Sequence, residues 1–188
     1  MIISKSRSNA TDWEVHHTSL ANTQTIQLNT TSAAGTNNAY NNTDPTSSVF
    51  SVTASGFGAN RTMVSYCFAE KQGYSKFGSY TGNGNADGPF TYLGFKPAWV
   101  LIKQTNSGNI WELFDNKRSP FNLVDDYLSP DASDAETTGS SQSLDFLSNG
   151  FKPRANASGL NGSGSSYIYM CFAENPFTTS TGVPATAR

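Results

Sequence analysis

The chain contains two diverged copies of one sequence unit. The segment MVSYCFAE, which begins at residue 63, returns as YIYMCFAE at residue 167. Nearer the start, Trp13 follows Lys5 by eight positions, and Trp111 follows Lys103 by the same number. A third match pairs SVTASGF, from residue 51, with DFLSNGF, from residue 145. Because the three matches keep their order, we expect a repeated fold in which equivalent strands occupy equivalent places.

The repeat divides the chain into a first unit of residues 1–72, a second unit of residues 73–176 and a C-terminal tail of residues 177–188. The second unit begins with the run GYSKFGSYTGNGNADGPFTYLGF, which has the pattern of a hairpin and has no counterpart before Met1. We therefore expect the chain to be a fragment, or its first unit to be completed by another segment. Since proteins normally cover open strand edges, we expect a neighbouring subunit or an N-terminal segment along the strand Ile2–Lys5.

Sequence periodicity predicts β-strands almost throughout. The segments WEVHH and WELFD, beginning at Trp13 and Trp111, alternate apolar and polar residues as half-buried strands do. The two CFAE segments are apolar on both faces, which is typical of central strands. We predict an all-β fold: a jelly-roll or concanavalin-like antiparallel β-sandwich built from two diverged repeats. Cys67 and Cys171 lie on the CFAE strands, so we expect both to be buried, reduced and unpaired.

Composition argues against several classes of partner. Only 14% of the residues are charged and the formal net charge is -2, so no basic surface indicates nucleic acid or an anionic membrane. We expect no membrane insertion, because no apolar run approaches the ~20 residues that cross a bilayer. The first residues lack the apolar core of a signal peptide. Asn, Ser, Thr and Gly are abundant beside 12% aromatic residues, which favours sheets joined by polar turns.

One loop has part of the spacing of a calcium site. Asn83, Asn85 and Asp87 stand at alternate positions before a glycine, as the first oxygen ligands of a calcium loop do. A complete loop has a bidentate glutamate at its twelfth position, where this chain has Gly94. We interpret the segment as a hairpin turn and keep calcium as the weaker alternative. No cofactor is expected.

Exposed aromatic residues are the other binding candidates. Tyr74, Tyr80 and Tyr92 belong to the lead-in hairpin, so they are candidates to line a surface groove that binds sugars or a neighbouring subunit. Trp13 and Trp111 occupy the same repeat position inside alternating strands, which predicts that they are core residues.

No motif indicates catalysis. His16 and His17 are adjacent on a predicted strand, so their rings face opposite sides and cannot hold one ion together. We expect one of them at the surface and the other in the core. Glu70 and Glu174 follow equivalent strands, so the repeat assigns them to separate sites rather than to the ~5–9.5 Å pair that a glycosidase needs. We therefore predict that the protein is not an enzyme.

Long motifs carry a resemblance to a known family. The segments YCFAEKQGYSKFGSYTGNGNADGPFTYLGFKPAWVLIK, WELFDNKR, LDFLSNGFK and YIYMCFAENPF span nearly the whole chain. They resemble a β-sandwich domain of unknown function that recurs in structural proteins of marine tailed bacteriophages, and the ending NPFTTSTGVPATAR resembles the tail of such proteins. The resemblance implies a virion protein, and it brings no known catalytic residue or ligand.

Together these observations lead us to expect a structural virion protein of a tailed phage, assembled in the bacterial host cytoplasm. A tail fibre or surface appendage is the leading role, and a capsid decoration protein is also open. Its expected partners are further copies of the chain or other virion proteins, with a host surface glycan as a further candidate. The alternative is a lectin-like, carbohydrate-binding module.

Overall fold

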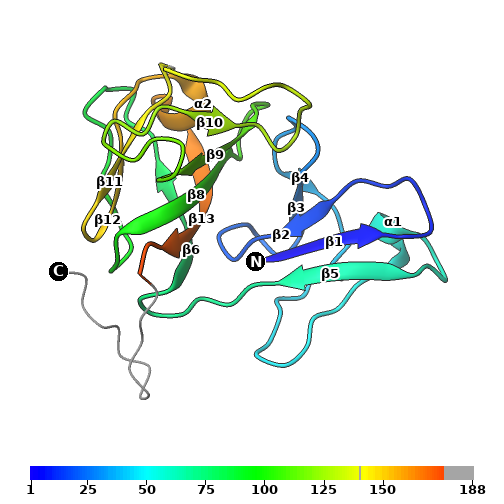
Figure 1. Cartoon of the computed structure of the whole chain (residues 1–188). Coiled ribbons are helices and arrows are strands. Elements are labelled where there is room, and N and C mark those ends of the chain that lie inside the picture. The colour runs from blue at the N-terminus through cyan, green and yellow to red at the C-terminus, as the bar shows by residue number, and fades with distance from the viewer. Residues whose placement is uncertain (140, 176–188) are drawn as a thin grey trace.

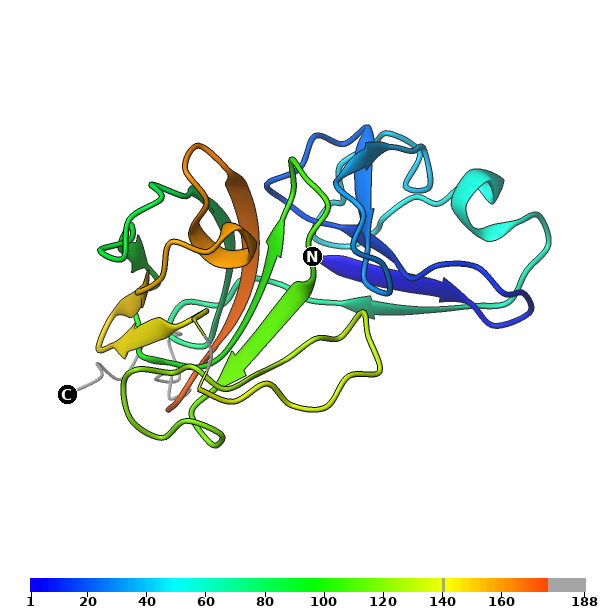
Figure 2. The ribbon, with the colours of Figure 1, turned by 90° about the horizontal axis from the view of Figure 1, so that it is seen from above.

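The structure, a computed structural model, describes residues 1–139 and 141–175; the predicted tail at residues 177–188 lies outside these residues. The described residues form three sheets whose neighbouring strands are all antiparallel. Figures 1 and 2 show the larger sheet of the second unit in the middle, with the sheet of the first unit on one side and a small sheet on the other. The predicted all-β antiparallel fold is confirmed, whereas jelly-roll connectivity stays a prediction.

The first sheet has five strands in the order β4-β3-β2-β1-β5 and contains only residues of the first unit. Its strands are β1 Ile2–Ser6, β2 Glu14–His16, β3 Gln24–Gln27, β4 Gly35–Thr36 and β5 Met63–Cys67. The one-turn helix α1, Ala54–Phe57, precedes β5. It begins after Thr53, whose hydroxyl accepts a hydrogen bond from the Ser55 backbone N–H, and it ends at Gly58, whose φ of 81° suits glycine.

The second unit forms a five-stranded sheet in the order β10-β9-β8-β13-β6 and a three-stranded sheet in the order β11-β12-β7. The strands of the larger sheet are β6 Ser75–Thr81, β8 Pro97–Gln104, β9 Trp111–Asp115, β10 Tyr127–Leu128 and β13 Ser166–Ala173. Those of the smaller sheet are β7 Thr91–Tyr92, β11 Leu144–Leu147 and β12 Gly150–Pro153, and the helix α2 is Ser158–Asn161.

The middle sheet has an apolar core on each of its faces. Side chains alternate along a strand, so Val100 and Ile102 of β8 face one core while Leu101 faces the other. The core containing Val100 and Ile102 also includes Phe146 and Phe151 of the three-stranded sheet. The core containing Leu101 is shared with the first sheet. The two repeat units are therefore packed into one body rather than separated by a linker.

The pairing registers of the two units are the same. In the first unit Ile2 of β1 lies opposite Cys67 of β5. In the second, Val100 of β8 lies opposite Cys171 of β13, and Val100 is the position that aligns with Ile2. On the other side of each central strand, Ser4 lies opposite Glu14 as Ile102 lies opposite Glu112. These registers confirm that the two strands bearing CFAE are structurally equivalent.

The expected position of the open edge is wrong. The strand Ile2–Lys5 lies inside β1, which pairs with β2 on one side and with β5 on the other. The reason lies in the lead-in hairpin of the second unit, whose strand β6 pairs with β13 and not with β8. Among the described residues, β5, the counterpart of β13, pairs with β1 alone.

The two cysteines differ for the same reason. Both are free thiols, but Cys171 is buried whereas Cys67 is exposed. The prediction that both are buried is correct for Cys171 and wrong for Cys67. Cys171 lies on a strand that has neighbours on both edges, whereas Cys67 ends the outermost strand of its sheet.

The phenylalanines of the two CFAE segments meet where the two five-stranded sheets join. Phe68 and Phe172, which are equivalent residues, contact each other edge to face with ring centroids 6.2 Å apart, and Phe77 of β6 contacts both. All three belong to the apolar cluster between the two five-stranded sheets. The predicted core position holds for Trp111, which is buried, and only in part for Trp13, which is half-buried beside the same cluster.

Candidate functional site

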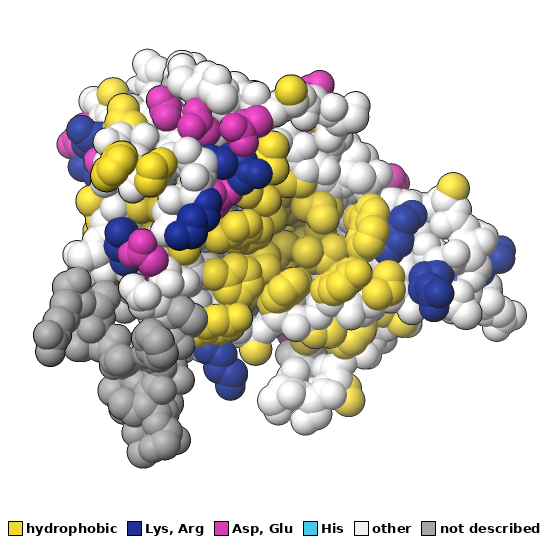
Figure 3. Space-filling view, in the orientation of Figure 1, with side chains coloured by type: hydrophobic (Ala, Val, Ile, Leu, Met, Phe, Trp, Pro, Cys, Tyr) yellow, Lys and Arg dark blue, Asp and Glu magenta, His cyan; other side chains and the backbone are white. Residues whose placement is uncertain are grey.

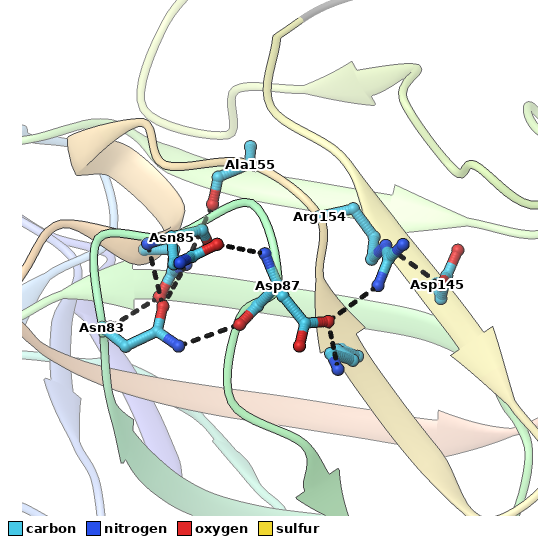
Figure 4. Close-up of polar contacts among 8 residues, drawn as sticks. Asn83, Asn85, Asp87, Asp145, Arg154 and Ala155 are labelled. Atoms are coloured by element: carbon cyan, nitrogen blue, oxygen red, sulfur yellow. Dashed lines mark hydrogen bonds and ion pairs between the residues drawn. The ribbon is translucent and has the colours of Figure 1, made fainter.

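The loop that sequence spacing singled out for calcium is a hydrogen-bonded turn (Figure 4). Asn83 Oδ1 accepts hydrogen bonds from the backbone N–H of Asn85 and from Asn161 Nδ2, each with a separation of 3.0 Å. Asn85 Oδ1 accepts from the backbone N–H of Asp87, at 2.9 Å. The fully buried Asn161 also donates to the backbone oxygens of Asn85 and Ala155. The amide oxygens that calcium would need are therefore already engaged as acceptors.

The single carboxylate of this loop is paired with two cations. Asp87 Oδ1 lies 2.6 Å from Lys152 Nζ and 3.1 Å from an Arg154 guanidinium nitrogen. The hydrogen bond and the charge of Lys152 lower the pKa of Asp87. Arg154 also contacts Asp145, at 3.4 Å. Within residues 1–139 and 141–175, no three His, Cys, Asp or Glu side chains are grouped to hold a metal ion. The geometry supports the turn interpretation.

The three candidate tyrosines do not form one groove. Tyr80 is only 9% exposed and stacks on Tyr167 in the core, so the prediction that it lines a surface groove is wrong. Its hydroxyl donates to the backbone oxygen of Leu160, at 2.6 Å. Tyr74 and Tyr92 are exposed as expected, at 43% and 61%. They occupy different places, because Tyr74 precedes β6 whereas Tyr92 lies on β7 of the small sheet.

Sequence reasoning missed a cavity of about 850 Å³ at one end of the first sheet. Its wall combines the start of β1, the end of β2, the loop of residues 44–50 and the chain that follows β5. Several lining residues are polar: Asp44, Thr46, Ser47, Ser48 and Glu70. The apolar part of the lining includes Phe50, Phe68 and Phe77. Aromatic rings beside hydroxyl, amide and carboxylate groups suit a polar ligand that also has apolar faces, such as a sugar.

His16 is the buried polar group of this cavity. Its residue is 5% exposed, and Nε2 has no hydrogen-bond partner within the described chain. The nearest carboxylate is that of Asp44, with Oδ1 4.0 Å from Nε2, and burial lowers the pKa of His16. His17 faces the opposite side of the sheet, where its Nε2 lies 3.1 Å from the Tyr169 backbone oxygen. The expectation of one surface histidine is therefore wrong, because the loop of residues 44–50 covers the side that His16 faces.

An apolar surface lies where the two five-stranded sheets meet, and it occupies the centre of Figure 3. Trp13 stacks on Tyr66, which is 50% exposed, with ring centroids 6.3 Å apart. Phe172 packs against Trp99 and Tyr74 at 5.6 and 5.7 Å. We define the front patch as the incompletely buried side chains Trp13, Tyr66, Tyr74, Trp99, Leu113 and Phe172. Apolar patches of this kind often mark contacts with other macromolecules.

The candidate carboxylates are separately engaged. Glu70 forms an ion pair with Lys76 at 3.3 Å, and Glu174 forms one with Lys96 at 2.8 Å. Glu112 is fully buried, and burial raises its pKa to about 8. An elevated pKa alone does not define an active site, since buried structural groups show the same shift.

Comparison with known protein families identifies a matching domain family. A family model described as "Domain of unknown function (DUF7483)" matches residues 1–176. Neither a curated protein nor a solved structure matches the chain significantly. Among the residues that the structure describes, no helix has the length and apolar character needed to cross a membrane.

Proposed function

The chain belongs to the DUF7483 family, a domain of unknown function, so its role has to be inferred from its own surfaces, and we propose that it is a non-enzymatic assembly module of a virus particle. The resemblance of its long motifs to structural proteins of tailed phages favours a tail fibre or surface appendage, with capsid decoration as the related possibility. In this role the chain binds other copies or other virion proteins and is localised to the virion.

The front patch is the observation that carries this proposal. It places four tyrosine and tryptophan rings together with Phe172 on one face of the molecule, and Tyr66 is half exposed. Aromatic residues of this kind are enriched in the centres of protein interfaces. Low net charge supports the same role, since it favours association over repulsion.

A particle-based experiment tests the assembly role. Mass spectrometry of purified particles of the encoding phage should detect the chain, and Tyr66→Glu should reduce its incorporation. Tyr92→Glu is the matched control, because Tyr92 is also exposed but lies on β7, outside the front patch. A chain that is absent from purified particles, and stays in the soluble lysate, would contradict the proposal.

A second candidate function, carbohydrate binding, is favoured by the cavity that His16 and Asp44 line. An unpartnered ring nitrogen beside hydroxyl-rich loop residues can accept or donate a hydrogen bond to a sugar hydroxyl. A glycan array on the wild-type chain tests this function, and Asp44→Ala should weaken any binding found. Asp12→Ala provides a control outside the cavity. If the chain binds no glycan on the array, this alternative is refuted, whereas the proposed assembly role is not affected.

A further inference from the structure

The strand β5 has one edge bonded and one edge open. Next to it, the Phe68 backbone N–H donates to the Met1 oxygen at 2.9 Å, and the Arg7 N–H donates to the Thr62 oxygen at 2.8 Å. In an antiparallel pair, alternate residues direct both backbone groups toward the partner strand. The backbone N–H and C=O groups of the even-numbered residues of β5, Val64 and Tyr66, therefore point toward β1. The backbone groups that face away from β1 belong to Met63, Ser65 and Cys67.

In the second unit the equivalent backbone groups are bonded by β6. Tyr167, Tyr169 and Cys171 of β13 are the repeat counterparts of the three outward-facing residues of β5. They lie opposite Tyr80, Gly78 and Lys76 of β6, in that order. The repeat therefore shows what occupies this edge when it is filled. It is an antiparallel strand that continues the sheet by one position.

Nothing in the sequence of β5 protects its open edge. The strand reads MVSYC, with neither a charged residue nor a proline, although exposed edges are usually blunted by such residues. Figure 1 shows β5 as the outermost strand of the first sheet. Within the described residues, no strand other than β1 pairs with it. Tyr66, which is half exposed, extends from this strand into the front patch.

We propose that β5 accepts an antiparallel β-strand of the β6 type from a partner polypeptide. This inference rests on the proposed assembly function and specifies one of its contacts. When the pairing register of β13 with β6 is transferred to β5, a small residue of the bound strand lies opposite Ser65, as Gly78 lies opposite Tyr169. It places an aromatic residue opposite Tyr66, as Phe77 lies opposite Met170. That aromatic side chain would lie on the front-patch side and extend the patch.

The repeat also predicts a difference between the two docking positions. A Cβ atom on Gly78 would lie 2.5 Å from the Tyr169 hydroxyl oxygen, so an alanine opposite Tyr169 would force that side chain to move. The counterpart of Tyr169 on β5 is Ser65, whose short side chain leaves that space free. A strand that carries alanine at this position should therefore still bind β5.

A peptide experiment on the full chain tests the proposal. The probe is a fluorescent peptide of residues 73–82, GYSKFGSYTG, titrated with the chain and followed by anisotropy. We expect saturable binding, retained within about twofold when alanine replaces Gly78 in the peptide. N-methylation of the peptide at Gly78 should weaken binding at least tenfold, because that N–H faces β5. N-methylation at Phe77, whose N–H faces away, should be tolerated.

Two variants of the chain provide a matched pair. Ser65→Pro removes an outward N–H without touching the bonds to β1, as an edge strand tolerates, and should weaken peptide binding at least tenfold. Ser65→Ala should bind the peptide normally, because it keeps the backbone N–H. It is a matched control, because both variants lose the 2.8 Å contact between the Ser4 and Ser65 hydroxyls. In hydrogen exchange, peptide should protect the amides of Met63, Ser65 and Cys67 and leave those of Val64 and Tyr66 unchanged.

Several results would overturn the proposal. Peptide binding that survives Ser65→Pro would place the peptide elsewhere, for example at β13 by strand exchange. Self-association of the chain that Ser65→Pro abolishes would assign the edge to β5 of a second copy instead. A chain that is found in particles but does not bind the peptide would refute this inference alone. Peptide binding by a chain that is absent from particles would refute the assembly function instead.

Discussion

Replacing the buried glutamate of the second unit should stabilise the protein in a pH-dependent way. Glu112 is fully buried on β9, and burial raises its pKa to about 8 from an ordinary value of 4.5. A hydrogen bond with Gln142 opposes this rise, and the negative charge of Asp131 adds to it. Glu112→Gln keeps the shape of the neutral side chain and removes the acid.

The sign follows from proton binding. Between pH 4.5 and 8 the folded chain keeps the Glu112 proton that the unfolded chain releases, so the free energy of unfolding falls as pH rises. The contribution of the Glu112 proton to the free energy of unfolding is fully present below the pKa of 4.5 in the unfolded chain. It is lost as the pH approaches the pKa of about 8 in the folded chain. With about 1.4 kcal/mol for each pH unit, the loss between about pH 5.5 and 7.5 is about 2.5 kcal/mol.

Urea unfolding of wild type and Glu112→Gln at both pH values measures this difference. Burial lowers the pKa of His17 to about 4, so this histidine acts with the opposite sign, and His16 shifts in the same direction. Both contributions cancel when the variant is compared with wild type at one pH. Relative to wild type, the free energy of unfolding of Glu112→Gln should therefore rise by about 2.5 kcal/mol when the pH is raised from about 5.5 to about 7.5.

The repeat supplies the control, Glu14→Gln. Glu14 aligns with Glu112, but its carboxylate accepts hydrogen bonds from Thr25 Oγ1 at 2.8 Å and Gln27 Nε2 at 3.2 Å. Glu14→Gln replaces one accepting oxygen of these two hydrogen bonds by an NH2 group, so it should destabilise the protein by about 1 kcal/mol. If Glu112→Gln shows the same stability difference from wild type at both pH values, the carboxyl is ionised in the folded protein and the reasoning fails.

Three further predictions concern individual residues. Asn161→Ala should lower the free energy of unfolding by about 2–4 kcal/mol in urea, because it removes four hydrogen bonds of the fully buried Asn161 side chain, one of them to the buried Ala155 oxygen; a change below about 1 kcal/mol would show that the turn is held by other bonds. In the native protein Cys67 should react with Ellman's reagent while Cys171 stays unreactive, since Cys171 is buried and burial raises its pKa; equal rates would contradict this. Gly78→Ala should cost about 1–3 kcal/mol by forcing Tyr169 to move, and an unchanged melting temperature would refute the contact.

The amino-acid sequence alone was sufficient to predict the local and repeated features of this protein: its strands, its repeat and one turn. Alternation of apolar and polar residues predicts strands because successive side chains of a strand point to opposite faces of the sheet. The recurrence of CFAE predicts the equivalence of β5 and β13, which the identical registers confirm. The turn at Asn83–Gly88 was also predictable, since the asparagines bond to backbone groups two residues ahead.

Which faces and edges are covered was decided only by the tertiary structure. Cys67 and Cys171 share one sequence context. Cys67 is exposed because, within the described residues, no strand pairs with the outer edge of β5, whereas Cys171 is buried on β13, which β6 pairs on that edge. Tyr80 is buried because Tyr167, far away in sequence, stacks on it. His16 faces a cavity whose wall comes from segments up to residue 77. Alternation sets the side of a strand from which a side chain projects, but burial depends on what a distant segment places there.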